Sequence, residues 1–174
     1  MKELWLEKEP SAIYGGKINQ LINLCQLGLS VPRALILPAD QVMAWLKVAL
    51  PEYSKQGLKE LIELGKEEIA ERLQQYPLDP AWQQELAAFC QENQAYIVRS
   101  SALLEDGQNM SFAGQYDSIG NCQTLSEIEQ GIHSCLLSLF NPEALAYWQR
   151  QGLSEQNFAM AVLKPAPPSL RIRT

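Results

Sequence analysis

One continuous stretch, residues 96–121, carries the side chains best suited to chemistry. A short strand-forming run, Tyr96 to Val98, is followed by Arg99, two serines and an acidic pair, and then by the small-residue loop Ser111-Phe-Ala-Gly-Gln115. An arginine meets a phosphate with a planar fork of donors. A loop that contains Gly114 can bring backbone N–H groups close to an anion. Together the two parts indicate a polyphosphate-binding loop, whereas each part alone also fits a surface arginine or an ordinary turn.

A second segment that suits an anion lies near the N-terminus. Gly15-Gly16-Lys17 precedes a run with helical spacing, and Gly28 fits the end of that helix. The apolar residues of the run are Ile18, Leu21, Ile22 and Cys25. Free N–H groups and the positive end of the dipole favour an anion at a helix N-terminus, and Lys17 adds a full charge. The spacing is not that of a P-loop, and taken alone the three residues better fit a glycine turn with a solvated lysine.

In their order along the chain, these motifs resemble the N-terminal nucleotide-binding domain of the pyruvate phosphate dikinase and phosphoenolpyruvate synthase family. The resemblance extends from Ile13 to Leu163, and Ser111-Phe-Ala-Gly-Gln115 is its most specific part. It implies a mixed α+β fold, helix-rich around a small sheet, that forms the N-terminal half of an ATP-grasp-like domain. We therefore expect residues 1–163 to be this half-domain and residues 164–174 to be a divergent proline-rich tail, because prolines cannot extend a central strand.

The resemblance also implies the ligand and the residues that hold it. It implies that Lys17 and Arg99 contact the phosphates of ATP, and that a loop closes over them. The loop residues are Ser111, Ala113, Gly114, Gln115 and Asp117. For Asp117 two roles stay open, one beside phosphate or metal and one as a simple cap of the loop. Mg²⁺ is implied together with ATP, but the family's metal-binding carboxylates belong to the second half of the domain, so we assign no metal ligand and no catalytic residue here.

Two functional hypotheses follow from this comparison. The first is an ATP-binding half-domain of a phosphotransferase that makes or uses phosphoenolpyruvate and is not catalytically competent alone. The second is a non-catalytic regulatory or assembly module derived from that domain. The expected partners are a nucleotide and either the second half of the domain or another copy of the chain. Whether the ending from Lys164 to Thr174 is native stays open at this point.

His133 is the chain's single histidine, and the family's phosphocarrier histidine has no counterpart here. It lies in a predicted helix whose apolar face includes Ile128, Ile132 and Leu136. Ser126 and Glu129 have the spacing of a capping box that would start this helix. His133 falls to the flank of the apolar face, without a metal-ligand or base–nucleophile pattern around it. We expect it on the helix surface.

The amino-acid composition restricts the kinds of partner and the cellular location that we expect for the chain. The net charge is −6 and the isoelectric point is near 4.9, which argues against nucleic acid or an anionic membrane as a partner. No signal peptide and no membrane-spanning apolar run is visible. The four cysteines show no Cys-x-x-Cys spacing. Cys25, Cys90 and Cys135 fall on apolar helical faces and are expected as small core residues in a reducing cytoplasm.

The other elements can be outlined from periodicity and from helix-end signals. Strands are predicted at 34–37, 96–99 and 158–163. Helices are predicted at 40–49, at 56–75, from Pro80 behind an Asp79 cap, and from Asn141-Pro142 through Trp148 to a stop at Gly152. The tryptophans are expected in packing roles rather than as a platform for stacking bases.

Overall fold

A computed structural model describes residues 2–3, 9–11, 13–51, 64–91, 94–102, 118–142 and 158–163. Within these ranges one antiparallel sheet has the strand order β1-β2-β5-β3-β4. The strands are β1 (Lys2–Glu3), β2 (Ala34–Leu37), β3 (Tyr96–Ala102), β4 (Ser118–Cys122) and β5 (Phe158–Leu163). The helices are α1 (Gly15–Gln26), α2 (Ala39–Ala49), α5 (Lys66–Gln75), α6 (Pro80–Phe89) and α7 (Leu125–Ser138). The predicted α+β class is confirmed.

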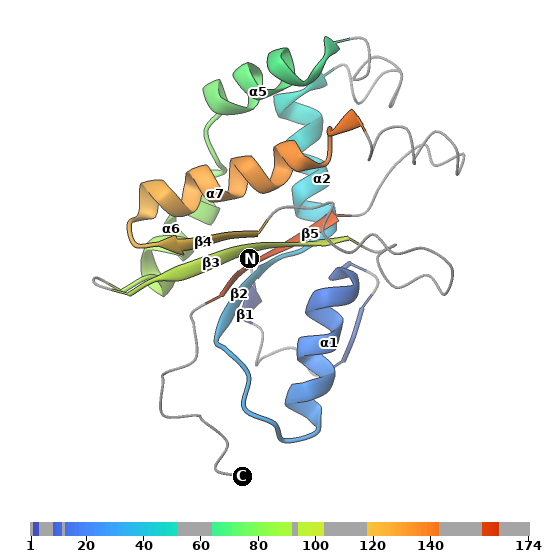
Figure 1. Cartoon of the computed structure of the whole chain (residues 1–174), viewed down its shortest axis with the longest axis vertical. Helices are drawn as coiled ribbons and strands as arrows, with labels where there is room; N and C mark the ends of the chain where they lie inside the picture. The colour runs from blue at the N-terminus through green and yellow to red at the C-terminus, as the bar shows by residue number, and fades with distance from the viewer. Residues whose placement is uncertain are drawn as a thin grey trace.

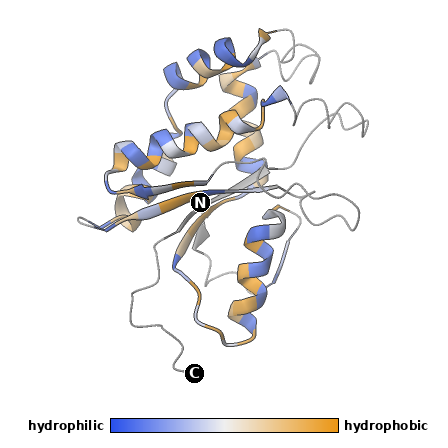
Figure 2. Ribbon diagram, viewed as in Figure 1, coloured by the Kyte–Doolittle hydropathy of each residue, from blue (hydrophilic) through white to orange (hydrophobic). Residues whose placement is uncertain are grey.

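The helices divide between the two faces of the sheet. Figure 1 shows α1 below the sheet, with α2, α5 and α7 above it. All four residues of β2 are buried because both of its faces are covered. Ala34 and Ile36 pack with α1, whereas Leu35 and Leu37 belong to the larger core under the other helices. In Figure 2, hydrophilic and hydrophobic residues alternate along α1 and α7, as expected for helices with one buried face.

β5 occupies a central position although it is the last in sequence of the strands that the structure describes. Leu35 of β2 and Val98 of β3 both pair with Val162, one on each side of β5. The strand predicted at 158–163 is therefore confirmed. It connects the strand that follows α1 to the strand that carries Arg99.

The first helix ends as its sequence predicts. Gly28 has φ +74° and donates its N–H to the carbonyl of Cys25 at 2.9 Å. Leu29 donates its N–H to the carbonyl of Leu24 at 3.1 Å. These two bonds make a Schellman motif, in which a glycine adopts the left-handed conformation and the last carbonyls are satisfied.

Two other helix starts give one confirmed prediction and one correction. Asp79 caps α6 as predicted, since its Oδ1 accepts the N–H of Ala81 at 2.8 Å. The capping box of α7, however, consists of Thr124 and Glu127 rather than Ser126 and Glu129. The helix begins at Leu125, so Ser126 already lies in its first turn.

The remaining element predictions are confirmed where the structure describes them, with one exception at Gly65. The strand at 34–37 has the predicted bounds, and the helices at 40–49 and from Pro80 correspond to α2 and α6. Of the helix predicted at 56–75, residues 66–75 form α5, but Gly65 precedes it with φ +78° as its N-cap, so the helix does not run continuously through Gly65 as predicted. Residues 56–63 and 143–152 lie outside the described residues. Trp45 and Trp82 are buried packing residues, as expected.

Within the same ranges, none of the helices is both long and apolar enough to cross a bilayer. Cys122 and Cys135 are buried and Cys25 and Cys90 are half-buried, all as free thiols. Burial raises the pKa of the Cys90 thiol to about 11, so this cysteine stays protonated near neutral pH.

Candidate anion-binding site

The N-terminus of α1 lies directly against the C-terminal end of β3. Gly15 opens the helix with φ +71°, and a Cβ added to it would lie 2.2 Å from the carbonyl oxygen of Ser101. No side chain fits in that space, and L residues rarely adopt that φ. Gly15 therefore permits a backbone-to-backbone approach that joins the two predicted anion-binding segments.

A buried hydrogen bond reinforces this approach. The N–H of Ile18, in the first turn of α1, donates to the Oγ of Ser101 at 3.1 Å, across 83 residues of sequence. Tyr14 precedes the helix and gives it no side-chain cap. Ser101 thus gives the first turn of α1 a side-chain hydrogen-bond acceptor that comes from a strand of the sheet.

Arg99 lies on the same face of the sheet as α1. Residues of β3 alternate between the faces, so Ile97, Arg99 and Ser101 share one of them. Ile97 packs with the α1 cluster, and Ser101 bonds to α1 itself. Arg99 lies between these two residues and is exposed.

Lys17 is half-buried in the first turn of α1, between Gly15 and Ile18. That turn contains no acidic residue. The positive end of the helix dipole is therefore not neutralised by a carboxylate from its own first turn. The arrangement brings a lysine, a helix N-terminus and an arginine-bearing strand to one face of the sheet, a combination that suits a multiply charged anion.

The other predicted site residues lie outside the described residues. They are Ser111, Ala113, Gly114, Gln115 and Asp117. The strands that flank them are described: β3 ends at Ala102, and β4 begins at Ser118, which pairs with Arg99 in the sheet. The chain therefore leaves the sheet one residue after Ser101 and returns to it beside Arg99.

Ser101 is a residue of the site that sequence reasoning did not single out. Its side chain is fully buried, as is that of Ser100. The sequence offered one signal, a pair of hydroxyls directly after the arginine at a strand end. It could not show which serine contacts the helix, because that depends on the face to which each residue points.

His133 differs from the prediction of a surface histidine. It is half-buried, its ring stacks on Trp45 with centroids 5.8 Å apart, and its Nε2 is buried without a hydrogen-bond partner in the described part of the chain. Burial lowers the pKa of His133, and nearby Glu129 opposes this only in part. Sequence periodicity could not reveal the contact because Trp45 comes from another helix.

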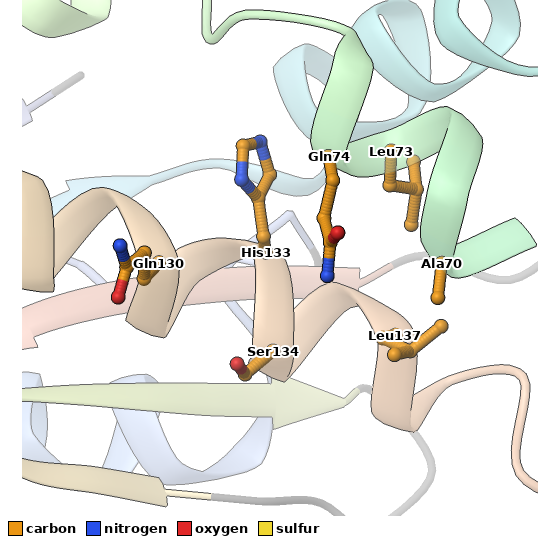
Figure 3. A pocket seen from close by; sticks show the side chains of 7 residues that line it. All are labelled: Ala70, Leu73, Gln74, Gln130, His133, Ser134 and Leu137. Carbon is orange, nitrogen blue, oxygen red and sulfur yellow. The ribbon is translucent and has the colours of Figure 1, made fainter. Parts of the chain in front are cut away.

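A cavity of about 470 Å³ adjoins His133 between α5 and α7 (Figure 3). It is lined by Ala70, Leu73, Gln74, Gln130, His133, Ser134 and Leu137. None of these seven described residues is a lysine or an arginine, and the cavity lies on the face of the sheet opposite to α1. Its chemistry does not suit a phosphate, and it is separate from the site at Lys17 and Arg99.

The described residues contain no group of three or more His, Cys, Asp or Glu side chains that could hold a metal ion. A metal ion at the site would therefore need ligands from elsewhere, such as the oxygens of a bound phosphate and water.

Sequence comparison shows which protein family the chain matches. Residues 11–163 match the family described as pyruvate phosphate dikinase, AMP/ATP-binding domain. The chain belongs to this family. The matched range includes α1, β3 and the segment between β3 and β4, so both halves of the candidate site lie inside the pyruvate phosphate dikinase AMP/ATP-binding domain.

Several curated relatives are similar to this chain. A probable phosphoenolpyruvate synthase of Methanocaldococcus jannaschii is 30% identical over 87% of the chain and 14% of its own length. The phosphoenolpyruvate synthase of Escherichia coli is 29% identical over 84% of the chain and 21% of its own length. A rifampicin phosphotransferase of Bacillus subtilis is 28% identical over 91% of the chain and 20% of its own length. The chain thus spans at most about a fifth of the length of these three relatives.

Proposed function

We propose that the chain binds the phosphates of ATP as the N-terminal part of the ATP-grasp-like nucleotide domain of a phosphotransferase. The observation that carries the proposal is the packing of the α1 N-terminus on β3 at Ser101, with Arg99 on the same face. Membership in a family of AMP/ATP-binding domains supports a nucleotide as the anion.

The chemistry of this face suits a polyphosphate. Lys17 supplies a compact charge and Arg99 a planar fork of donors, two kinds of contact that complement each other on a chain of phosphates. The chain as a whole carries a net charge of −6, so a place that gathers cations contrasts with the rest of the molecule. In this proposal the phosphate-binding site is completed by the segment that contains Ser111, Ala113, Gly114, Gln115 and Asp117.

The relatives' names support a phosphotransferase reaction for the whole enzyme. Two of the three are phosphoenolpyruvate synthases, and the third is a rifampicin phosphotransferase. We infer that this domain presents ATP for phosphoryl transfer, where positioning and charge stabilisation dominate catalysis. Mg²⁺ would arrive with ATP and neutralise part of its charge.

The chain's own histidine is not the phosphate acceptor in this proposal. His133 lies in α7, and the sheet separates α7 from α1. An acceptor must come within bonding distance of the transferred phosphate. Transfer therefore requires an acceptor group other than His133, and in this proposal the chain alone binds nucleotide without turning it over.

Isothermal titration calorimetry with Mg-ATP tests the proposal. We expect saturable binding, which Lys17→Ala and Arg99→Ala each weaken by about tenfold to hundredfold, because hydrogen bonds to charged groups contribute about 1.5–3 kcal/mol. Lys47→Ala is the matched control, since Lys47 is an exposed lysine of α2 on the other side of the sheet. No heat at millimolar nucleotide, or equal affinity in all four proteins, contradicts the proposal.

An assembly module is the second candidate. Leu24, Leu27 and Leu29 are exposed around the C-terminal end of α1. An apolar group of this kind can pack against a second half of the domain or another copy of the chain. Light scattering distinguishes this role: a concentration-dependent dimer that Leu27→Asn abolishes supports self-association, and a monomer at high concentration argues against it.

A further inference from the structure

We propose that Ser101 is the positioning residue of the nucleotide site, and that its hydroxyl holds the first turn of α1 so that Lys17 and Arg99 meet the same phosphate chain. This inference rests on the proposed function. It assigns a role to a side chain that bears no charge.

The first step is that β3 holds the helix at two points. Gly15 lies against the carbonyl of Ser101, and Ile18 donates its N–H to the hydroxyl of the same serine. Gly15 and Ile18 flank Lys17 in the sequence. The backbone of Lys17 is thus fixed to the end of the strand on both sides.

The second step is that Ser101 also fixes the strand side of the site. It lies two residues after Arg99 on the same face of β3, and one residue before the end of that strand. A single side chain therefore connects the helix that carries Lys17 to the strand that carries Arg99. Binding constellations lose strength when their groups move by about half an ångström, so a loose helix end costs affinity.

The third step is the cost of losing the hydroxyl. The bond is buried, and Ser101 is fully buried. Without the Oγ, the N–H of Ile18 loses its buried acceptor on β3, and the carbonyl of Tyr14, one turn earlier, is the acceptor that helix geometry offers in its place. A buried donor without a partner is unfavourable, so the first turn would shift toward solvent or toward another acceptor.

Ser100 provides a matched control. It has the same side chain and the same full burial, but it points to the opposite face of β3. Ser100→Ala and Ser101→Ala therefore remove the same group at equal depth, and Ser101→Ala is the variant that removes the bond to the N–H of Ile18.

The experiment measures Mg-ATP affinity and the exchange rate of the Ile18 amide hydrogen in both variants. We expect Ser101→Ala to weaken the affinity about tenfold and to speed Ile18 exchange, and Ser100→Ala to change the affinity by less than about twofold. In a Lys17→Ala background, Ser101→Ala should weaken binding much less than in the unmodified chain, because the two effects share one cause. Ser101→Cys, which keeps a side chain of similar shape but a weak acceptor, should behave like Ser101→Ala and serves if the alanine variant does not fold.

The outcomes separate this inference from the proposed function. If the unmodified chain binds Mg-ATP and Lys17→Ala weakens it, but Ser101→Ala does not, the inference is overturned and the function stands. If the unmodified chain does not bind, the function fails and the inference fails with it. If Ser100→Ala weakens binding as much as Ser101→Ala, the effect is a general loss of stability, and Ser101 has no special role.

Discussion

At the scale of single residues, Gly15 has two constraints that other described glycines do not combine. Its φ is +71°, and the backbone of Ser101 occupies the place where a side chain would begin. Gly28 has nearly the same φ, +74°, but open space around it. A side chain at Gly28 would therefore introduce conformational strain alone, whereas a side chain at Gly15 would introduce both strain and a steric clash.

The comparison of Gly15→Ala with Gly28→Ala tests whether the steric clash lowers stability beyond the effect of the strain. We expect Gly28→Ala to lower the free energy of unfolding by about 1 kcal/mol, the usual cost of a left-handed alanine. Gly15→Ala should cost roughly 1–3 kcal/mol more, because α1 must also move away from β3. Urea unfolding measures both values, and equal losses would show that the contact with Ser101 is unimportant.

His133 predicts how stability depends on pH. Its folded-state pKa lies below the ordinary value of about 6.5, because burial disfavours the charged imidazolium. The unfolded chain therefore takes up a proton more readily than the folded one. The contribution to stability is complete above about pH 6.5 and is lost as the pH falls below it.

The matched variant is His133→Phe, which retains an aromatic ring against Trp45 but cannot titrate. Denaturant unfolding between pH 7.5 and 5.5 should show declining stability in the unmodified chain and a flatter profile in the variant. Because His133 is the chain's single histidine, no other imidazole contributes to this interval. Parallel profiles would contradict the buried, unpartnered placement of Nε2.

At the scale of elements, α7 shows where a local motif is ambiguous. The sequence contains two overlapping candidates for a capping box, Thr124 with Glu127 and Ser126 with Glu129, two residues apart. Both have the required spacing. In the structure the Thr124 hydroxyl accepts the N–H of Glu127 at 3.2 Å, and the Glu127 carboxylate accepts the N–H of Thr124 at 3.0 Å.

Alanine substitutions distinguish the two candidates. Thr124→Ala should lower the free energy of unfolding by about 1 kcal/mol, the usual value for an N-cap. Ser126→Ala should change it by less than about 0.5 kcal/mol, because Ser126 is an exposed residue inside the helix. Thermal unfolding of the two variants gives the answer, and a larger loss at Ser126 would mean that the helix starts two residues later in solution.

Most individual elements could be predicted because their signals are local. The apolar run at β2, the Asp79-Pro80 start of α6 and the glycine after α1 each specify structure within a few residues. The contact of Trp45 with His133 could not be predicted, because it joins helices far apart in the sequence. Local sequence signals therefore predict individual helices and strands, but they do not predict which of these elements pack against each other.

At the scale of the whole molecule, the sheet order was the part that the sequence did not reveal. Periodicity indicates that 158–163 is a strand, but it says nothing about β5 lying between β2 and β3. For the candidate site the sequence indicated Lys17 and Arg99, and it took the alternation of β3 and the position of α1 to place them on one face. The same topology puts His133 and its cavity on the other face.

The most direct test of this arrangement is a titration of the isotope-labelled chain with Mg-ATP, followed by two-dimensional NMR of the backbone amides. We expect the largest changes in amide chemical shift at Gly16, Lys17, Arg99 and Ser101. The changes around His133 and along α7 should be small. Shifts concentrated at α5 and α7, with the amides of Lys17 and Arg99 unchanged, would contradict a nucleotide site between α1 and β3.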